Sequence, residues 1–297
     1  DELYFTLKVE AASREKRGPL VMLHGYGSGA GIYYAAAPAI ASRWNGPVFA
    51  IDSLGCGLSS RPDHNPAIGY GKAADLKQAE NFFVDGLEQW RKAMNFDKIT
   101  IVGHSLGGYI STCYSERYPE NVEKLILVGC AGIPEKPQGF EENLASRGFL
   151  LRTVNSLMTD KGWSPFTLVK YGPGSSIVGG YVRRRFEGLD HVPTEELHQY
   201  IYQSWAGGNV STGGYSHNLF LGPMAYAKSP LIHRIPQIKL DKISFVYGES
   251  DWMNPKHAFD IREGLEASST PNTPKADVFL VSKAGHNVMV DNPEGFV

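Results

Sequence analysis

The pentapeptide Gly-His-Ser-Leu-Gly at 103–107 constrains the fold of this chain more than any other segment. It follows the apolar run 99–102, which is typical of a buried strand, and it precedes a helical pattern that starts at Leu106. A G-x-S-x-G sequence between a strand and a helix is a nucleophile elbow, a sharp turn that exposes a serine at the end of the strand. We therefore predict that Ser105 is a catalytic nucleophile.

The partners that a serine nucleophile needs occur later in the chain, in the order Ser, Asp, His that is typical of this elbow. Asp251 and His286 each follow a β-rich run and a turn that contains glycine. An imidazole can take the serine proton and return it to the leaving group, while a buried carboxylate fixes the imidazole tautomer. We predict the triad Ser105, Asp251 and His286. The alternatives are a loop carboxylate or a helix cap before Pro255 for Asp251, and a surface histidine for His286.

An acyl-transfer site also needs two backbone N–H groups aimed at the oxygen that becomes negative. The amide of Leu106, directly after the nucleophile, is the first candidate. The second is the amide of Tyr26, in the glycine-rich loop 24–29 that follows the apolar run 20–23. These glycines could instead cradle a phosphate, but no G-K-[ST] follows and the spacing is not G-x-G-x-x-G. We therefore predict an oxyanion hole rather than a nucleotide site.

Apolar runs alternate with helical patterns along the chain, which is typical of α/β proteins. Strands are expected at 3–10, 20–23, 47–51, 98–102, 123–129, 243–247 and 277–281. Several runs are continuously apolar, as in strands buried on both faces of a parallel sheet. The clearest helical pattern runs from about Ala74 to Met94. We predict an α/β-hydrolase fold, with a mostly parallel central sheet, flanking helices and a largely helical lid.

The alternation of strands and helices stops between about Gly132 and Pro236. We therefore expect a hydrolase core in two parts, 1–132 and 237–297, separated by a lid or cap insertion at 133–236. The first residue lies close to the first expected strand, and the segment 292–294 predicts a helix start only a few residues before the end. From these positions we expect a natural protein that is longer at both termini.

The lid sequence has an unbalanced charge. Between positions 143 and 185 there are seven basic residues and one acidic residue, in a chain whose net charge is −2. Apolar and aromatic residues separate these charges, as in elements that lie on an anionic membrane surface. The residues predicted to contact lipid are Arg183, Arg184, Arg185, Trp163 and Phe166. The alternative is a lid helix with its apolar face on the core and its charges in water.

The composition argues against several other classes of protein. A net charge of −2 gives no basis for nucleic-acid binding. The three cysteines (Cys56, Cys113 and Cys130) have no C-x-x-C spacing, so we expect neither a metal site nor a disulfide framework, and a reducing compartment fits best. No apolar run reaches the roughly 18 residues that a membrane-spanning helix needs. The sequence also shows no signal or transit peptide.

Three segments together resemble one subfamily of α/β-hydrolases: the elbow at 103–107, the acid segment at 248–251 and the tail at 286–294. That subfamily contains the fungal cardiolipin-specific deacylase, the animal lysophospholipase that acts on N-acyl-phosphatidylethanolamine, and the lipid-droplet coactivator of triglyceride lipase. The resemblance covers nearly the whole chain. The lid segments 183–186 and 227–231 look especially like the fungal branch.

The resemblance also points to a second motif. His286 and Asp291 match the H-x4-D motif of this subfamily, which is associated with acyl transfer to lysophospholipids. Because His286 would also be the triad base, the motif could be partly a by-product of the fold. Asp291 could instead cap a helix before Pro293. The coactivator members lack the nucleophile, whereas Ser105 is present here.

The resemblance implies a serine acyl hydrolase that acts on cardiolipin or a related anionic glycerophospholipid, with no metal and no organic cofactor. One alternative is an acyl-CoA-dependent lysophospholipid acyltransferase, and another is a non-catalytic protein that regulates a different lipase. The expected partners are the phospholipid substrate and an anionic membrane surface contacted by the lid. The expected location is intracellular and peripheral to a membrane, at the mitochondrial inner membrane or, alternatively, at a lipid droplet or in the cytoplasm.

Overall fold

A single mixed sheet organises the computed structural model. The structure describes residues 3–9, 17–62, 76–140, 142–143, 169–186, 189–206, 220–268, 271 and 273–297. The strands are β1 (Thr6–Val9), β2 (Leu20–Leu23), β3 (Val48–Ile51), β4 (Ile99–His104), β5 (Val122–Val128), β6 (Lys242–Gly248) and β7 (Lys275–Val281). Their order in the sheet is β1-β3-β2-β4-β5-β6-β7. β1 is antiparallel to β3, and the other neighbouring pairs are parallel.

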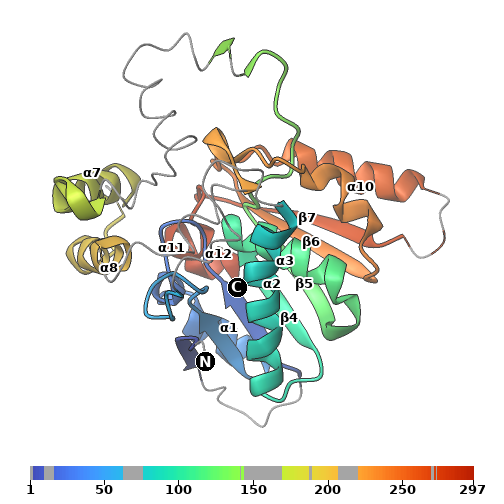
Figure 1. Ribbon diagram of the computed structural model, residues 1–297, viewed down its shortest axis with the longest axis horizontal. Helices are drawn as coiled ribbons and strands as arrows, with labels where there is room; N and C mark the ends of the chain where they lie inside the picture. Colours follow the sequence, from blue (N-terminus) through green and yellow to red (C-terminus); the bar gives the residue numbers. More distant parts are fainter. Residues whose placement is uncertain are drawn as a thin grey trace.

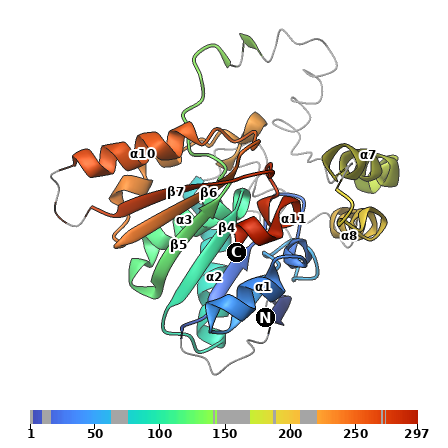
Figure 2. The ribbon, with the colours of Figure 1, turned by 180° about the vertical axis from the view of Figure 1, so that it is seen from behind.

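Helices cover both faces of this sheet (Figures 1 and 2). The α-helices are α1 (Ala37–Trp44), α2 (Leu76–Ala93), α3 (Leu106–Arg117), α7 (Gly174–Phe186), α8 (Thr194–Ala206), α10 (Lys256–Ala267), α11 (Val288–Asp291) and α12 (Pro293–Phe296). Short 3₁₀ helices are η1 (Ala30–Tyr33), η2 (Pro119–Asn121), η3 (Pro223–Ala225), η4 (Leu231–His233) and η5 (Ile235–Gln237). This arrangement confirms the predicted α/β architecture with a mostly parallel sheet and flanking helices.

The strands divide the apolar residues between two cores because successive side chains of a strand point to opposite faces. Val21 and Leu23 of β2 belong to a core shared with α2, α3 and α10. Leu20 and Met22 belong to a second core, shared with α1, α11 and the helices α7 and α8. Burial on both faces explains the continuously apolar strand sequences.

The segment between β5 and β6, predicted as a lid, contains α7 and α8, which pack on each other at one side of the sheet (Figures 1 and 2). Val178, Val182 and Phe186 repeat at helical spacing along α7 and are buried in the second core. Trp163 and Phe166 lie outside the described residues. Within the described parts of the chain, no helix is long and apolar enough to cross a membrane.

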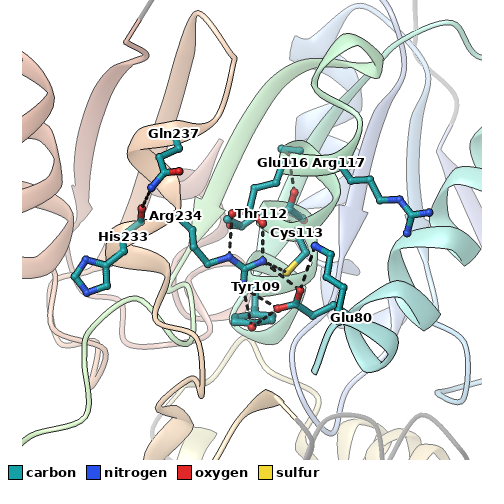
Figure 3. A network of polar contacts seen from close by, with 12 residues as sticks. Glu80, Tyr109, Thr112, Cys113, Glu116, Arg117, His233, Arg234 and Gln237 are labelled. Carbon is teal, nitrogen blue, oxygen red and sulfur yellow. Dashed lines mark hydrogen bonds and ion pairs between the residues drawn. The ribbon is translucent and has the colours of Figure 1, made fainter. Parts of the chain in front are cut away.

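A partly buried ion cluster joins the segment before β6 to the helix that follows the elbow (Figure 3). Arg234 donates hydrogen bonds to Glu80 of α2 at 2.7 Å and to Glu116 of α3 at 2.5 Å. The Tyr109 hydroxyl donates to Glu80 at 2.6 Å. Burial by itself would raise the pKa of Glu80, but the bonds from Arg234 and Tyr109 outweigh burial and place this pKa below its ordinary value. Glu80 therefore stays ionised at neutral pH.

Replacing Arg234 by methionine is expected to lower the free energy of unfolding by about 3 kcal/mol. The buried Glu80 loses the cation that donates to it and keeps only the exposed Lys77 near its carboxylate. Urea denaturation followed by circular dichroism measures the change. Lys256→Met removes an exposed ion pair with Asp260 and is the matched control, with an expected cost of at most about 1 kcal/mol. Equal midpoints for the two variants would show that the cluster contributes little.

The contribution of this cluster should also depend on pH. A carboxyl group whose folded pKa is lowered stabilises the fold above its unfolded pKa and loses that effect as the pH falls through the folded value. The difference between wild type and Arg234→Met should therefore shrink in acid as Glu80 becomes protonated.

Candidate active site

Ser105 lies at the turn between β4 and α3, in a backbone conformation that serine rarely adopts. Its φ is +53° and its ψ is −113°, and such strain is often retained at functional sites. A Cβ on Gly107 would lie 2.4 Å from the carbonyl oxygen of Leu23, and a Cβ on Gly103 would lie 2.5 Å from that of Gly107. Both motif glycines are thus required by close backbone packing, and the predicted strand–turn–helix elbow is confirmed.

Asp251 and His286, predicted as acid and base, are in contact. Asp251 follows β6, His286 lies between β7 and α11, and Nδ1 of His286 is 2.9 Å from Oδ1 of Asp251. The Asp251 side chain is 0% exposed, and its Oδ1 also accepts the Met253 amide at 2.9 Å. Because a carboxylate accepts, Nδ1 of His286 is the donor. In the neutral imidazole with this tautomer, Nε2 of His286 is the acceptor.

A glycine that the sequence analysis did not single out makes room for this pair. Gly129 directly follows β5, with a φ of +48°. A Cβ there would lie 2.7 Å from Oδ2 of Asp251 and 3.0 Å from Nδ1 of His286. Any other residue would therefore collide with the pair, but only the fold brings this glycine next to two residues so distant in sequence.

His104 connects the elbow to the loop of the candidate base. Its Nε2 is 2.9 Å from the carbonyl oxygen of His286, and the two imidazole rings are 4.8 Å apart. A carbonyl only accepts, so Nε2 of His104 carries the proton. Burial, and then the charge of His286, lower the pKa of His104 well below its ordinary value, which keeps the ring neutral. Ser105, the next residue, thus lies on the same edge of the sheet as His286.

The two amides predicted for the oxyanion hole come from segments that meet beside Ser105. Leu106 begins α3, so its N–H belongs to the first turn, whose amides have no acceptor within the helix. A Cβ on Gly25 would lie 3.0 Å from the Cβ of Ser105. The loop that continues to Tyr26 therefore packs against the elbow.

Asp52 holds the loop that carries Tyr26 in place by hydrogen bonds, a role that the sequence does not indicate. It is buried directly after β3. Its Oδ1 accepts the Ala30 amide at 2.6 Å and its Oδ2 accepts the Leu58 amide at 2.8 Å. Asp52 thus holds two loops together at the carboxyl end of the sheet.

Helix α8 of the predicted lid also contacts this loop. The Tyr200 hydroxyl accepts the Gly31 amide at 2.9 Å, and the Trp205 indole donates to the carbonyl oxygen of Gly27. A Cβ on Gly27 would lie 2.4 Å from the Trp205 ring. This part of the predicted lid therefore packs against the loop that carries Tyr26.

Asp291 ends α11, and Oδ2 of its buried carboxylate accepts two hydrogen bonds. One comes from the Gly285 amide at 2.7 Å, and the other from Nη2 of Arg185 in the last turn of α7 at 2.6 Å. The cap of α12 is instead Asn292, whose Oδ1 accepts the Gly295 amide at 3.0 Å. The alternative of Asp291 as that helix cap is therefore wrong.

Of the arginines predicted to contact lipid, Arg185 is bound within the protein, while Arg183 and Arg184 are exposed. A buried carboxylate is a strong partner for an arginine, and the charge pattern alone does not show which arginine binds it. Lipid contact by these arginines stays a prediction.

Two further observations bear on substrate and cofactor. Trp252, directly after the candidate acid, is 54% exposed, and its ring lies 5.2 Å from that of His286. An exposed aromatic ring beside the candidate base offers an apolar surface to a ligand. Within the described residues, no group of three or more His, Cys, Asp or Glu side chains is arranged to hold a metal ion.

Comparison with known families matches residues 18–163 to the alpha/beta hydrolase fold. A protein named 1-acylglycerol-3-phosphate O-acyltransferase from Arabidopsis thaliana is 32% identical over 295 residues, which are 96% of this chain and 66% of that protein. The protein named 1-acylglycerol-3-phosphate O-acyltransferase ABHD5 from Sus scrofa is 31% identical over 290 residues, 94% of this chain and 75% of that protein.

Among solved structures, an esterase from Exiguobacterium antarcticum has a TM-score of 0.65 at 17% identity, covering 99% of this chain and 92% of that chain. At this identity the match shows the fold alone. The closer resemblance to the fungal cardiolipin deacylase branch stays a prediction.

Proposed function

The chain belongs to the α/β-hydrolase family, and from this premise we propose that it is a serine enzyme that cleaves a fatty acyl ester of a membrane glycerophospholipid. The observation that carries the proposal is the contact of His286 with the buried Asp251, on the sheet edge where the strained elbow presents Ser105. These are the three groups that a serine acyl hydrolase needs, in its usual chain order. Cardiolipin is the substrate that we propose first, from the sequence resemblance.

The proposed reaction has two steps. In the first, Oγ of Ser105 attacks the acyl carbonyl carbon while Nε2 of His286 takes the hydroxyl proton, and the carbonyl oxygen becomes negative between the Leu106 and Tyr26 amides. The ester bond then breaks, and His286 gives its proton to the departing lysolipid oxygen. In the second, His286 takes a proton from water, which attacks the acyl-serine. Fatty acid leaves and Ser105 recovers its proton.

Acyl transfer to a lysolipid is the second candidate, because the plant and pig relatives are both named 1-acylglycerol-3-phosphate O-acyltransferase. In that reaction an acyl-CoA would donate the acyl group to Ser105 and a free thiol would leave. The hydroxyl group of 1-acylglycerol-3-phosphate would then replace water in the second step. The same triad could serve both reactions, since only the acyl donor and the acceptor differ.

One assay separates the candidates. Purified protein is incubated with phospholipid vesicles of defined head group, including cardiolipin, and separately with acyl-CoA plus 1-acylglycerol-3-phosphate, and products are identified by mass spectrometry. Fatty acid and lysolipid without acyl-CoA indicate the hydrolase. Diacylglycerol phosphate and free CoA indicate the transferase. If neither forms and a fluorophosphonate probe leaves Ser105 unlabelled, the protein is a non-catalytic regulator and the proposal fails.

We further propose that α7 docks on anionic membrane. Its outer face combines Ile177 and Tyr181, which are 40% and 36% exposed, with the exposed Arg183 and Arg184. Aromatic and aliphatic residues beside basic ones are typical of helices at a charged lipid surface. An intracellular, membrane-peripheral location, at the mitochondrial inner membrane or a lipid droplet, belongs to this proposal.

The double variant Arg183→Glu/Arg184→Glu is expected to weaken binding to cardiolipin-containing vesicles at least about 10-fold at low salt, because each basic residue near the surface is worth about 1 kcal/mol. Vesicle flotation measures the binding, and the difference should shrink as added salt screens the charges. Arg43→Glu/Lys98→Glu changes the net charge equally at two exposed positions outside α7 and is the control. Equal binding of all three proteins, or equal binding to neutral vesicles, would contradict membrane docking by α7.

A further inference from the structure

Three separate contacts fix the loop that carries His286. Asp251 accepts from its side chain, and His104 donates to its carbonyl oxygen. The third contact is made one residue earlier, where the Gly285 amide donates to Asp291 at 2.7 Å. The orientation of the candidate base therefore depends on two groups outside the triad, of which Asp291 is the charged one.

Asp291 also binds a residue of the predicted lid. The same oxygen that accepts the Gly285 amide accepts Nη2 of Arg185, at the end of α7. The Asp291 side chain is 4% exposed and that of Arg185 26% exposed, so the ion pair is largely shielded from water. A Cβ on Gly285 would lie 3.2 Å from Nη2 of Arg185. Arginine, carboxylate and base loop are thus closely packed.

A second bond joins the same two parts of the chain. Nε2 of His191, between α7 and α8, donates to the carbonyl oxygen of Val290 in α11 at 2.8 Å. The lid is thus attached to α11 at two consecutive residues, immediately after the base loop. A displacement of α7 relative to α11 would strain or break these bonds.

We propose that Asp291 is a positioning residue that couples the lid to the base: its carboxylate holds Gly285, and hence His286, in place as long as Arg185 of α7 neutralises it. A buried carboxylate without its counter-charge is costly, so loss of Arg185 would shift Asp291 toward water and move the loop bonded to it. This inference rests on the proposed role of His286 as base. On this proposal, the aspartate of the H-x4-D motif positions the base in both candidate reactions, hydrolysis and acyl transfer.

The test compares Arg185→Met with Arg43→Met, which removes an exposed arginine of α1. Two measurements are made: kcat and KM for a short soluble ester, and the proton NMR resonance of the hydrogen bond between His286 and Asp251. Arg185→Met is expected to lower kcat by about 10- to 100-fold, because misplacing a catalytic group by about 1 Å can cost about 100-fold. KM should change little, and the resonance should shift or broaden. Arg43→Met should match wild type in kcat, in KM and in the NMR resonance.

Further variants separate positioning from loss of fold. Asp291→Asn keeps an acceptor for Gly285 but loses the charge, so its kcat should lie between those of wild type and Asp291→Ala. Arg185→Lys keeps the charge and should recover part of the activity lost in Arg185→Met. The double variant Arg185→Met/Asp291→Ala should be no slower than Asp291→Ala, because the two residues act through one contact. Thermal unfolding by circular dichroism confirms that each variant is folded.

Two results would overturn the inference: a kcat and resonance for Arg185→Met equal to those of Arg43→Met, or losses that multiply in the double variant. Failure of the proposed function has a different signature. If the wild type cleaves no ester but its resonance responds to Arg185→Met as described, the lid still positions His286 and only the assignment as an ester hydrolase is lost.

Discussion

Ser105→Ala is expected to fold like the wild type and to lose acyl-ester cleavage by about 10⁴-fold or more, because only binding and the oxyanion amides would remain. The Cβ that causes the strain at a φ of +53° is present in both residues, so the elbow itself is preserved. Measured kcat/KM on vesicle lipid and on a soluble ester should fall together. Thermal stability should be unchanged or raised.

Ser42→Ala, at an exposed position of α1, is the control for Ser105→Ala and should retain full activity. A fluorophosphonate probe should label wild type and Ser42→Ala at Ser105 and leave Ser105→Ala unlabelled, as peptide mass spectrometry would show. Activity retained in Ser105→Ala, in a preparation free of other esterases, would exclude the serine mechanism.

Asp251→Asn is expected to lower kcat by about 10²- to 10⁴-fold with little loss of stability. The carboxylate accepts the Nδ1 proton of His286, whereas an asparagine amide can donate to that nitrogen. The imidazole would then carry its proton on Nε2, where it could no longer take the proton of Ser105. Steady-state kinetics together with thermal unfolding distinguish this tautomer effect from a loss of fold.

Asp52→Asn tests whether the acid has been identified correctly. Asp52 is also buried after a strand, but it accepts amides of two loops. Its replacement should therefore lower the free energy of unfolding, while kcat of the folded variant changes little. If Asp251→Asn kept wild-type kcat while folded Asp52→Asn lost it, the acid would be misassigned.

Local patterns were sufficient to predict the elements that present the site. The apolar run 99–102 corresponds to β4, and the helical pattern from Ala74 to Met94 contains α2, which the structure describes from Leu76 to Ala93. Asp251 and His286 could be predicted because residues after parallel strands meet at one edge of a sheet, whatever their distance in sequence. Such predictions require only periodicity and chain order.

Other contacts between distant segments could not be predicted in this way. Arg185 and Asp291 are 106 positions apart, and neither the basic cluster nor the H-x4-D spacing indicates that they pair. Asp52 and Gly129 follow strands like many other residues, and their tasks depend on which loop or side chain the fold brings against them. The charge pattern of α7 correctly indicates a helix with a polar face, but it cannot identify which arginine a buried carboxylate will bind.

The division of the apolar residues into two cores has a consequence for how such proteins diverge. Val178, Val182 and Phe186 of α7 lie in the same core as Val288 and Met289 of α11, so part of the lid serves as a wall of the domain. A lid that shares a core cannot be exchanged between homologues as an independent module. Chimeras, and natural recombination alike, would have to transfer the lid together with α11. New substrate preferences should therefore arise by substitutions within the lid more readily than by its replacement.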